Sequence, residues 1–272
     1  MTSVFQARGV SVSFGGVRAV AGVDLEIQAG ELVGLIGPNG AGKTTFIDAV
    51  TGFVRHEGTV ELDGSSLDGL PPHARAQRGL ARTWQTVELF DDLTVRENLT
   101  VAAKGGRVSP RGMPSRGLRG LARWRADDIG PGGASVDEDL ELLDLKSAAD
   151  AMPSELTQAE RKRAGIGRAL VARPKLLLLD EPGAGLDVRQ SRELGELLPG
   201  IARTGMAVLL VDHDMGLVLS VCDRVVVLDA GAVIAQGTAA EIRNDGRVIA
   251  AYLGHGGNGG NGTAETTTGA SS

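Results

Sequence analysis

The sequence predicts an α/β protein with a mostly parallel β-sheet at its core, an N-terminal antiparallel β subdomain and a helical subdomain inserted between core strands. A glycine-rich stretch, 37–45, follows a strand-like run, Leu32 to Ile36, as in the strand-to-helix turns of α/β sheets. Two short apolar runs, 176–179 and 208–211, are typical of parallel strands buried on both faces. The segment 93–170 has mainly helical periodicity.

Composition excludes several classes of protein. The chain has 272 residues, of which 42% are hydrophobic, so it can form a proper core. Its net charge of -6 gives no general attraction to nucleic acid or to an anionic membrane. The single cysteine rules out an internal disulfide, and neither a secretory signal nor a membrane-spanning run is recognised. We therefore expect a soluble protein of the cytoplasm.

The first strands read as an antiparallel pair. Alternating apolar residues predict strands at Val4 to Phe14 and Val23 to Ile27, joined across Gly15 and Gly16 and a turn near Gly22. The pattern leaves Phe14 uncovered. Two roles stay open for this side chain on the residues alone, stacking on a nucleotide base or packing in the core.

The glycine-rich stretch matches the pattern G-x-x-x-x-G-K-[ST] in full. Glycines let consecutive backbone N–H groups point inward around a triphosphate, and the helix that follows presents the positive end of its dipole. Lys43 is expected to reach the β- and γ-phosphates, and Thr44 to complete the coordination of Mg²⁺. The matching residues are Gly37, Pro38, Asn39, Gly40, Ala41, Gly42, Lys43, Thr44 and Thr45.

A helix is predicted at Thr44 to Thr51 and a strand at Thr59 to Leu62. A further strand, Leu80 to Trp84, leads directly into Gln85. An amide at a strand end can bind a metal or orient a water molecule, but most isolated glutamines do neither. The spacing alone does not decide the role of Gln85.

Two capping boxes occur in the helical segment. Ser135 to Glu138 opens a predicted helix that continues through Leu145, and Thr157 to Glu160 opens a second helix over 161–171. Before them, the stretch 104–125 is rich in basic residues and has no acidic one. Two interpretations are compatible with that composition. The stretch contacts lipid headgroups or a membrane-bound partner, or it is a solvated insertion.

Polar side chains follow both buried apolar runs. Asp180 and Glu181 come directly after the run at 176–179, and His213 follows the run at 208–211. Carboxyl ends of parallel strands meet at one edge of a sheet, which is where ligands bind. Asp180 is suited to hold Mg²⁺ through water and Glu181 to accept a proton from an attacking water. We expect His213 to donate to a γ-phosphate.

The chain ends in a hairpin, a helix and a tail. Strands are predicted at Val225 to Leu228 and Val233 to Ala235 around the turn Asp229 to Gly231. Glu241 to Tyr252 is predicted as one helix. The stretch 256–272 is rich in glycine, asparagine and threonine and is expected to be disordered.

Together these motifs resemble the ATP-binding subunit of ABC transporters, over nearly all of 1–254. The resemblance implies a P-loop NTPase ABC cassette with a RecA-like core, an ABC ATP-binding domain at 1–254 with a helical subdomain inserted at about 87–170, and a disordered tail at 255–272. The matching motifs are the phosphate loop Gly37 to Thr45, the glutamine loop at Gln85, the signature Leu156 to Glu160, the acidic strand end Leu176 to Glu181, the D-loop Gly185 to Asp187 and the histidine switch at His213.

The resemblance also implies roles for individual residues, with ATP and Mg²⁺ as cofactors. Catalysis falls to Glu181, His213 and Lys43, and metal binding to Thr44, Gln85 and Asp180. Phe14 takes the place of the family's adenine-stacking aromatic residue. The implied nucleotide contacts are Phe14, Gly37, Pro38, Asn39, Gly40, Ala41, Gly42, Lys43, Thr44, Thr45, Gln85 and Thr157.

Three stretches, Gly79 to Thr86, Val211 to Met215 and Asn244 to Gly254, are similar to the branched-chain amino acid importer ATPases. This similarity implies permease subunits and a second ATPase as partners, a solute-binding protein as an indirect partner and no nucleic acid. It also implies a peripheral location on the cytoplasmic face of the plasma membrane. Related subunits serve other small polar solutes, so the solute stays open.

The signature departs from the family pattern LSGGQ, because Leu156-Thr157-Gln158-Ala159-Glu160 occupies its place. The resemblance implies that two subunits clamp ATP, with the signature of one facing the phosphate loop of the other. Thr157 keeps a hydroxyl, but Gln158 adds bulk and Glu160 adds negative charge near the nucleotide bound by the partner. A unit charge at about 6 Å from another costs roughly 3 kcal/mol at an effective dielectric near 20. We therefore expect an asymmetric heterodimer with one impaired ATP site. A degenerate, regulatory subunit and a non-transport ABC ATPase are the alternatives.

Overall fold

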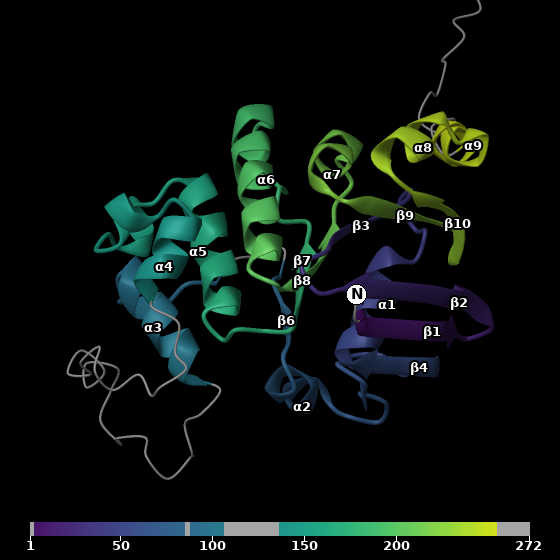
Figure 1. The fold of residues 1–272 in the computed structure, drawn as a ribbon, viewed down its shortest axis with the longest axis horizontal. Coiled ribbons are helices and arrows are strands. Elements are labelled where there is room, and N and C mark those ends of the chain that lie inside the picture. Colours follow the sequence, from purple (N-terminus) through teal and green to yellow (C-terminus); the bar gives the residue numbers. More distant parts are fainter. Residues whose placement is uncertain (1–2, 85–87, 106–135, 255–272) are drawn as a thin grey trace, which may run out of the picture.

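The computed structural model describes residues 3–84, 88–105 and 136–254. Two β-sheets form its centre, and helices surround the larger one (Figure 1). The predicted basic insertion from 106 onward and the C-terminal tail lie outside the described residues, as does Gln85.

The smaller sheet is antiparallel, with strand order β2-β1-β4-β5. Its strands are β1 (Ser3–Phe14), β2 (Val17–Gln28), β4 (Glu57–Leu62) and β5 (Ser65–Ser66). The hairpin of β1 and β2 is longer than predicted, because pairing starts at Phe14 and Val17 instead of near Val23. Gly15 and Gly16, both at positive φ, make the tight turn between them, which permits pairing up to the turn.

The larger sheet is the predicted parallel core, with strand order β10-β9-β3-β8-β7-β6. Its strands are β3 (Leu32–Ile36), β6 (Leu80–Arg82), β7 (Leu176–Asp180), β8 (Ala207–Val211), β9 (Arg224–Asp229) and β10 (Ala232–Gly237). All neighbours pair in parallel except β10, which runs antiparallel to β9. The predicted α/β class, with a parallel core and an antiparallel N-terminal sheet, is confirmed.

The run of leucines in β7 serves two cores at once. Side chains alternate across a strand, so successive leucines face opposite layers. Leu176 and Leu178 belong to the cluster shared with the antiparallel sheet and α1, whereas Leu177 and Leu179 belong to the cluster shared with the helices. All four are fully buried, which explains why the sequence shows no alternation here.

The helices lie around this sheet, with α3, α4 and α5 grouped on one side of the molecule and α1 between the two sheets (Figure 1). The phosphate-loop helix and its successors are α1 (Lys43–Thr51), α2 (Pro72–Gln77), α3 (Val95–Gly105), α4 (Val136–Leu142), α5 (Gln158–Leu170), α6 (Val188–Arg203), α7 (Met215–Val221), α8 (Ala239–Asn244) and α9 (Gly246–Gly254). Short 3-10 turns occupy Lys146–Ala148 and Pro153–Glu155.

Besides the start of β2, several predicted boundaries are wrong, including those of α4, β6 and the last helix. Helix α4 stops at Leu142 instead of Leu145, since Asp144 adopts a positive φ of 52° that no right-handed helix permits. Strand β6 stops at Arg82 instead of Trp84. The last helix is two helices, because Asp245 is extended and its carboxylate accepts from the N–H of Arg247, which starts α9 afresh.

Within the described ranges, no helix combines the length and the apolar character needed to cross a bilayer.

Candidate functional site

The carboxyl ends of the parallel strands converge on one edge of the larger sheet. The phosphate loop follows β3, Asp180 ends β7 and Glu181 follows it, and His213 comes shortly after β8. Because β8 pairs with both β3 and β7, these three strand ends are neighbours. The predicted meeting of loop, acids and imidazole thus corresponds to the strand order of the structure.

The phosphate loop has the backbone that its glycines were expected to permit. Gly37, Gly40 and Gly42 all have positive φ, at 154°, 80° and 100°. A Cβ at Gly37 would lie 2.1 Å from the carbonyl oxygen of Leu228, and one at Gly42 would lie 2.4 Å from that of Ala19. The loop is therefore pressed between the hairpin of the smaller sheet and the end of β9.

A main-chain bridge fixes the loop to both sheets. The carbonyl of Ala41 accepts a hydrogen bond from the N–H of Gly231 at 3.0 Å, and the carbonyl of Gly231 accepts one from the N–H of Ala21 at 2.8 Å. The turn between β9 and β10 thus connects the loop to β2. Phe14, at the end of β1 in the same hairpin, is 52% exposed, as its pattern predicted, and is available for stacking.

Lys43 is the first residue of α1 and only 8% exposed. Its Nζ donates to the carbonyls of Gly37 at 2.6 Å and Pro38 at 3.1 Å, so the amine is folded back across the loop. Burial lowers the pKa of Lys43, and the negative charges of Glu181 and Asp180 oppose that shift. The ammonium therefore lies within electrostatic reach of both acids.

Glu181 is held in a strained conformation. Its φ is 46°, in the left-handed region that non-glycine residues rarely adopt, and its N–H donates to the carbonyl of Val211 at 2.7 Å. Such backbone costs about 1–3 kcal/mol and is common at functional sites. The strain turns Glu181 out of the line of β7, toward the residues that follow β8.

His213 is the exposed member of the group. Its Nδ1 lies 3.9 Å from Oε2 of Glu181 and 3.5 Å from Oδ1 of Asp212. Asp212 is buried and accepts hydrogen bonds from the N–H groups of Gly183 and Asp214, so it fixes the loop on which His213 stands. The imidazole is 62% exposed, so it is open to solvent at the sheet edge.

Two further charged residues were not predicted. Arg82, at the end of β6, binds Asp180 at 2.7 Å and Asp48 of α1 at 2.6 Å. Lys162 on α5 is 8% exposed; burial lowers its pKa, and Asp212 and Glu181 oppose the shift. The sequence marks Arg82 only by its place as a basic residue near the end of a predicted strand, which does not predict that it pairs with Asp180 or Asp48.

The altered signature lies apart from the chain's own phosphate loop. Thr157 caps α5, which lies across strands β6 to β8 from α1 (Figure 1). The carboxylate of Glu160 folds back, accepting from the N–H of Thr157 at 2.8 Å and from its hydroxyl at 2.7 Å. The amide of Gln158 lies against Gly185, where a Cβ would come within 2.5 Å of its Nε2.

The donor set suits Mg²⁺. Thr44 and Asp180 offer a hydroxyl and a carboxylate, the hard oxygen ligands that this ion prefers, and Mg²⁺ is usually held by one or two carboxylates together with phosphates. Over the residues that the structure describes, no cluster of three or more His, Cys, Asp or Glu side chains could hold a metal alone. The residues therefore fit a metal that arrives with a nucleotide.

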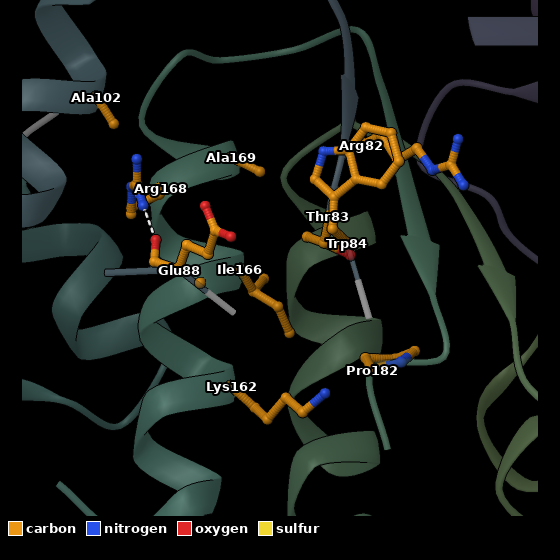
Figure 2. A pocket seen from close by; sticks show the side chains of 11 residues that line it. Arg82, Thr83, Trp84, Glu88, Ala102, Lys162, Ile166, Arg168, Ala169 and Pro182 are labelled. Carbon is orange, nitrogen blue, oxygen red and sulfur yellow. Dashed lines mark hydrogen bonds between the residues drawn. The ribbon is translucent and has the colours of Figure 1, made fainter. Parts of the chain in front are cut away.

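A hollow of about 740 Å³ opens beside this edge, between α5 and the ends of β6 and β7. Figure 2 shows Lys162, Ile166 and Ala169 of α5 along one wall, with Trp84 and Pro182 opposite. Arg168 donates to the backbone carbonyl of Glu88 at its rim (Figure 2).

Comparison with known proteins gives relatives over nearly the whole chain. A family model described as ABC transporter matches residues 20–184, and one described as branched-chain amino acid ATP-binding cassette transporter matches 232–258. The branched-chain amino acid transport ATP-binding protein BraF of Pseudomonas aeruginosa is 38% identical over 255 residues, which cover 92% of this chain and 98% of BraF. LivG of Salmonella typhimurium, also named as a high-affinity branched-chain amino acid transport ATP-binding protein, is 41% identical over 248 residues, covering 90% and 96%.

A solved structure agrees in fold. The crystal structure of the ADP conformation of an ATP-binding cassette of an ABC transporter superposes with a TM-score of 0.77 at 26% identity, covering 93% of this chain and 100% of that one. The resemblance expected from the motifs is confirmed: the chain belongs to the ABC transporter family, as one of its ATP-binding cassettes.

Proposed function

We propose that the chain is the ATP-hydrolysing subunit of an importer for branched-chain amino acids or a related small polar solute. The observation that carries the proposal is the convergence of Lys43, Asp180, Glu181 and His213 on one sheet edge beside a glycine-rich loop. The names of BraF and LivG support the solute class. We assign the ATP-binding domain to 1–254, with a helical subdomain inserted at about 87–170.

ATP is the substrate, and the roles follow from position. The loop amides and Lys43 bind the phosphates, Phe14 stacks on the adenine, and Glu181 accepts a proton from the water that attacks the γ-phosphorus. The bond to the bridging oxygen breaks and ADP leaves. Lys43 and His213 stabilise the charge on the transferred group.

Mg²⁺ would be held by Thr44 and Asp180, with Gln85 as a further candidate that lies outside the described residues. When bound, the ion neutralises charge on the phosphate oxygens. The strained backbone of Glu181 keeps its carboxylate on the side of His213, so the proton acceptor is placed before substrate arrives.

Three variants test this assignment, in ATP binding by the isolated chain and in ATP hydrolysis by the chain mixed with its partner subunit. Glu181→Gln should keep ATP binding and lower turnover by about 10²–10⁴-fold, because the amide cannot accept the proton. Lys43→Ala should weaken binding itself. Arg192→Gln, which removes an exposed ion pair on α6, is the control and should match the unchanged protein in both assays. Full turnover by Glu181→Gln would exclude it as the general base.

We further propose a second, different ATPase subunit as partner. In a cassette dimer, the signature of one subunit faces the phosphate loop of the other, and here Glu160 places a carboxylate on that signature, bonded to the Thr157 hydroxyl. The partner's nucleotide would meet a negative charge and an occupied hydroxyl. One ATP site is then impaired, and a homodimer would carry the defect twice.

The chain offers a matched control for this charge. Thr238 and Glu241 form the same capping box at α8 as Thr157 and Glu160 form at α5. Glu160→Gln should raise ATP turnover of the isolated chain, whereas Glu241→Gln should leave it unchanged. Vigorous turnover by the unaltered chain alone would reject the heterodimer and favour a homodimer. No turnover with any partner would favour a regulatory subunit.

The permease is proposed to dock at the hollow beside Trp84, between α5 and the ends of β6 and β7. ATP-driven closure then moves the segment between Gln85 and Leu156 against the permease, with the solute-binding protein as an indirect partner and the ATPase peripheral on the cytoplasmic membrane face. Co-purification with permease subunits from membranes tests this docking. Uptake of leucine against other small solutes by reconstituted complexes tests the solute.

A further inference from the structure

Arg82 occupies a position between the site and the surface. It ends β6, and its side chain is only 6% exposed. One guanidinium nitrogen binds Oδ2 of Asp180 at 2.7 Å, and the other binds Oδ1 of Asp48 at 2.6 Å. The planar fork of one arginine therefore connects the acid at the end of β7 with α1, the helix that follows the phosphate loop.

Arg82 fixes the orientation of the Asp180 carboxylate. A carboxylate that binds a metal needs its orientation fixed, and a charge-assisted hydrogen bond to one of its oxygens does this. The N–H of Asp180 also donates to the Thr83 hydroxyl at 3.4 Å, next to Arg82 in the chain. Residues at the end of β6 thus fix both the main chain and the side chain of Asp180.

The other side of the guanidinium faces an aromatic pair. Its central carbon lies 4.2 Å from the centre of the Trp84 ring, a cation–π contact. Trp84 meets Phe53 edge to face, with ring centres 5.2 Å apart. Both rings are about half exposed, and Trp84 lines the hollow described above (Figure 2).

We propose that Arg82 is a positioning residue, which orients Asp180 for Mg²⁺ and transmits the state of that acid to the Trp84–Phe53 surface. Its charge is shared among Asp180, Asp48 and the indole ring. When a cation binds Asp180, the ion pair between Asp180 and Arg82 weakens, and the contact of the guanidinium with Trp84 changes as a result. The inference rests on the proposed function, since it requires a Mg²⁺–ATP site.

The two tryptophans of the chain make the contact measurable. In a Trp124→Phe background, Trp84 is the only tryptophan, and its emission responds to a change in its contact with the guanidinium. Mg²⁺ is titrated at a fixed concentration of a non-hydrolysable ATP analogue, and binding of the analogue is measured with Mg²⁺ and with EDTA. Neither readout depends on turnover.

Arg82→Gln should raise the Mg²⁺ concentration for half-maximal binding by about 10–100-fold, the usual effect of losing a partner of a metal ligand. Binding in EDTA should stay the same, and the Mg²⁺-dependent change in Trp84 emission should disappear. Arg82→Lys should be intermediate, because an ammonium cannot hold two acids as a fork does. Arg224 is the first residue of β9 and forms a half-buried ion pair with Glu31. Arg224→Gln removes this pair and should behave like the Trp124→Phe background protein in both measurements.

An unchanged Mg²⁺ dependence in Arg82→Gln would overturn the inference. If that variant fails to fold by circular dichroism, a background-like Mg²⁺ dependence and emission change in Arg82→Lys would overturn it equally. Failure of the proposed function has a different result, since the background protein itself would then bind no analogue in a Mg²⁺-dependent way. That outcome would reject both.

Discussion

Gly42→Ala should damage the fold of the phosphate loop more than Gly40→Ala does. Both glycines have positive φ, 100° and 80°, so a Cβ costs each about 1–2 kcal/mol of backbone strain. Only at Gly42 would the Cβ also meet an obstacle, the carbonyl oxygen of Ala19 at 2.4 Å, whereas nothing lies within 4 Å at Gly40. Displacing that main chain adds about 1–3 kcal/mol.

The free energy of unfolding should therefore fall by about 1–2 kcal/mol for Gly40→Ala and by roughly 2–5 kcal/mol for Gly42→Ala, out of a typical ~5–15 kcal/mol. Urea denaturation followed by far-UV circular dichroism measures both, without nucleotide, so that ligand binding does not enter. Equal losses in the two variants would refute the role assigned to the contact between loop and hairpin.

Three more predictions concern other parts of the chain. Burial raises the pKa of Cys222 from 9.0 to about 12, so iodoacetamide at pH 8.5 should label the folded protein far more slowly than the urea-unfolded one. The stability that the neutral thiol contributes is complete below pH 9 and should fall as pH rises toward 12, a loss that Cys222→Ala should lack in urea titrations. Leu99→Ala, at a fully buried site between α3 and α5, should cost about 2–5 kcal/mol in the same titrations. Thr238→Ala should cost about 1 kcal/mol through loss of the α8 cap, and Thr238→Ser should restore most of it.

Local patterns predicted most of the fold. The leucines of β7 and the apolar run of β8 are short, wholly apolar and bounded by polar residues, a pattern typical of a buried parallel strand. The exposure of Phe14 also followed from its neighbours. Boundary predictions were wrong where the backbone of one residue ends a helix, through the positive φ of Asp144 and the extended ψ of Asp245, because the conformation of a single residue leaves no periodic pattern in the sequence.

The candidate site was predictable where a motif names its residue, and not elsewhere. Lys43, Asp180 and His213 are each marked by a loop or a strand end. The importance of Arg82 depends on Asp48 and Asp180, which lie 34 and 98 positions away in the chain. Local spacing carries no information about such pairs, since the strand order of the sheet brings them together.

Because β7 carries four consecutive leucines, hydrophobicity alone specifies its register with the neighbouring strands only weakly. A slip by one position would still present leucine to both layers, yet it would swing Asp180 to the other face of the sheet. The polar contacts at the strand's end, from Arg82 and Thr83, penalise that slip. The same atoms that would orient the metal ligand thus also hold β7 in register with its neighbours during folding.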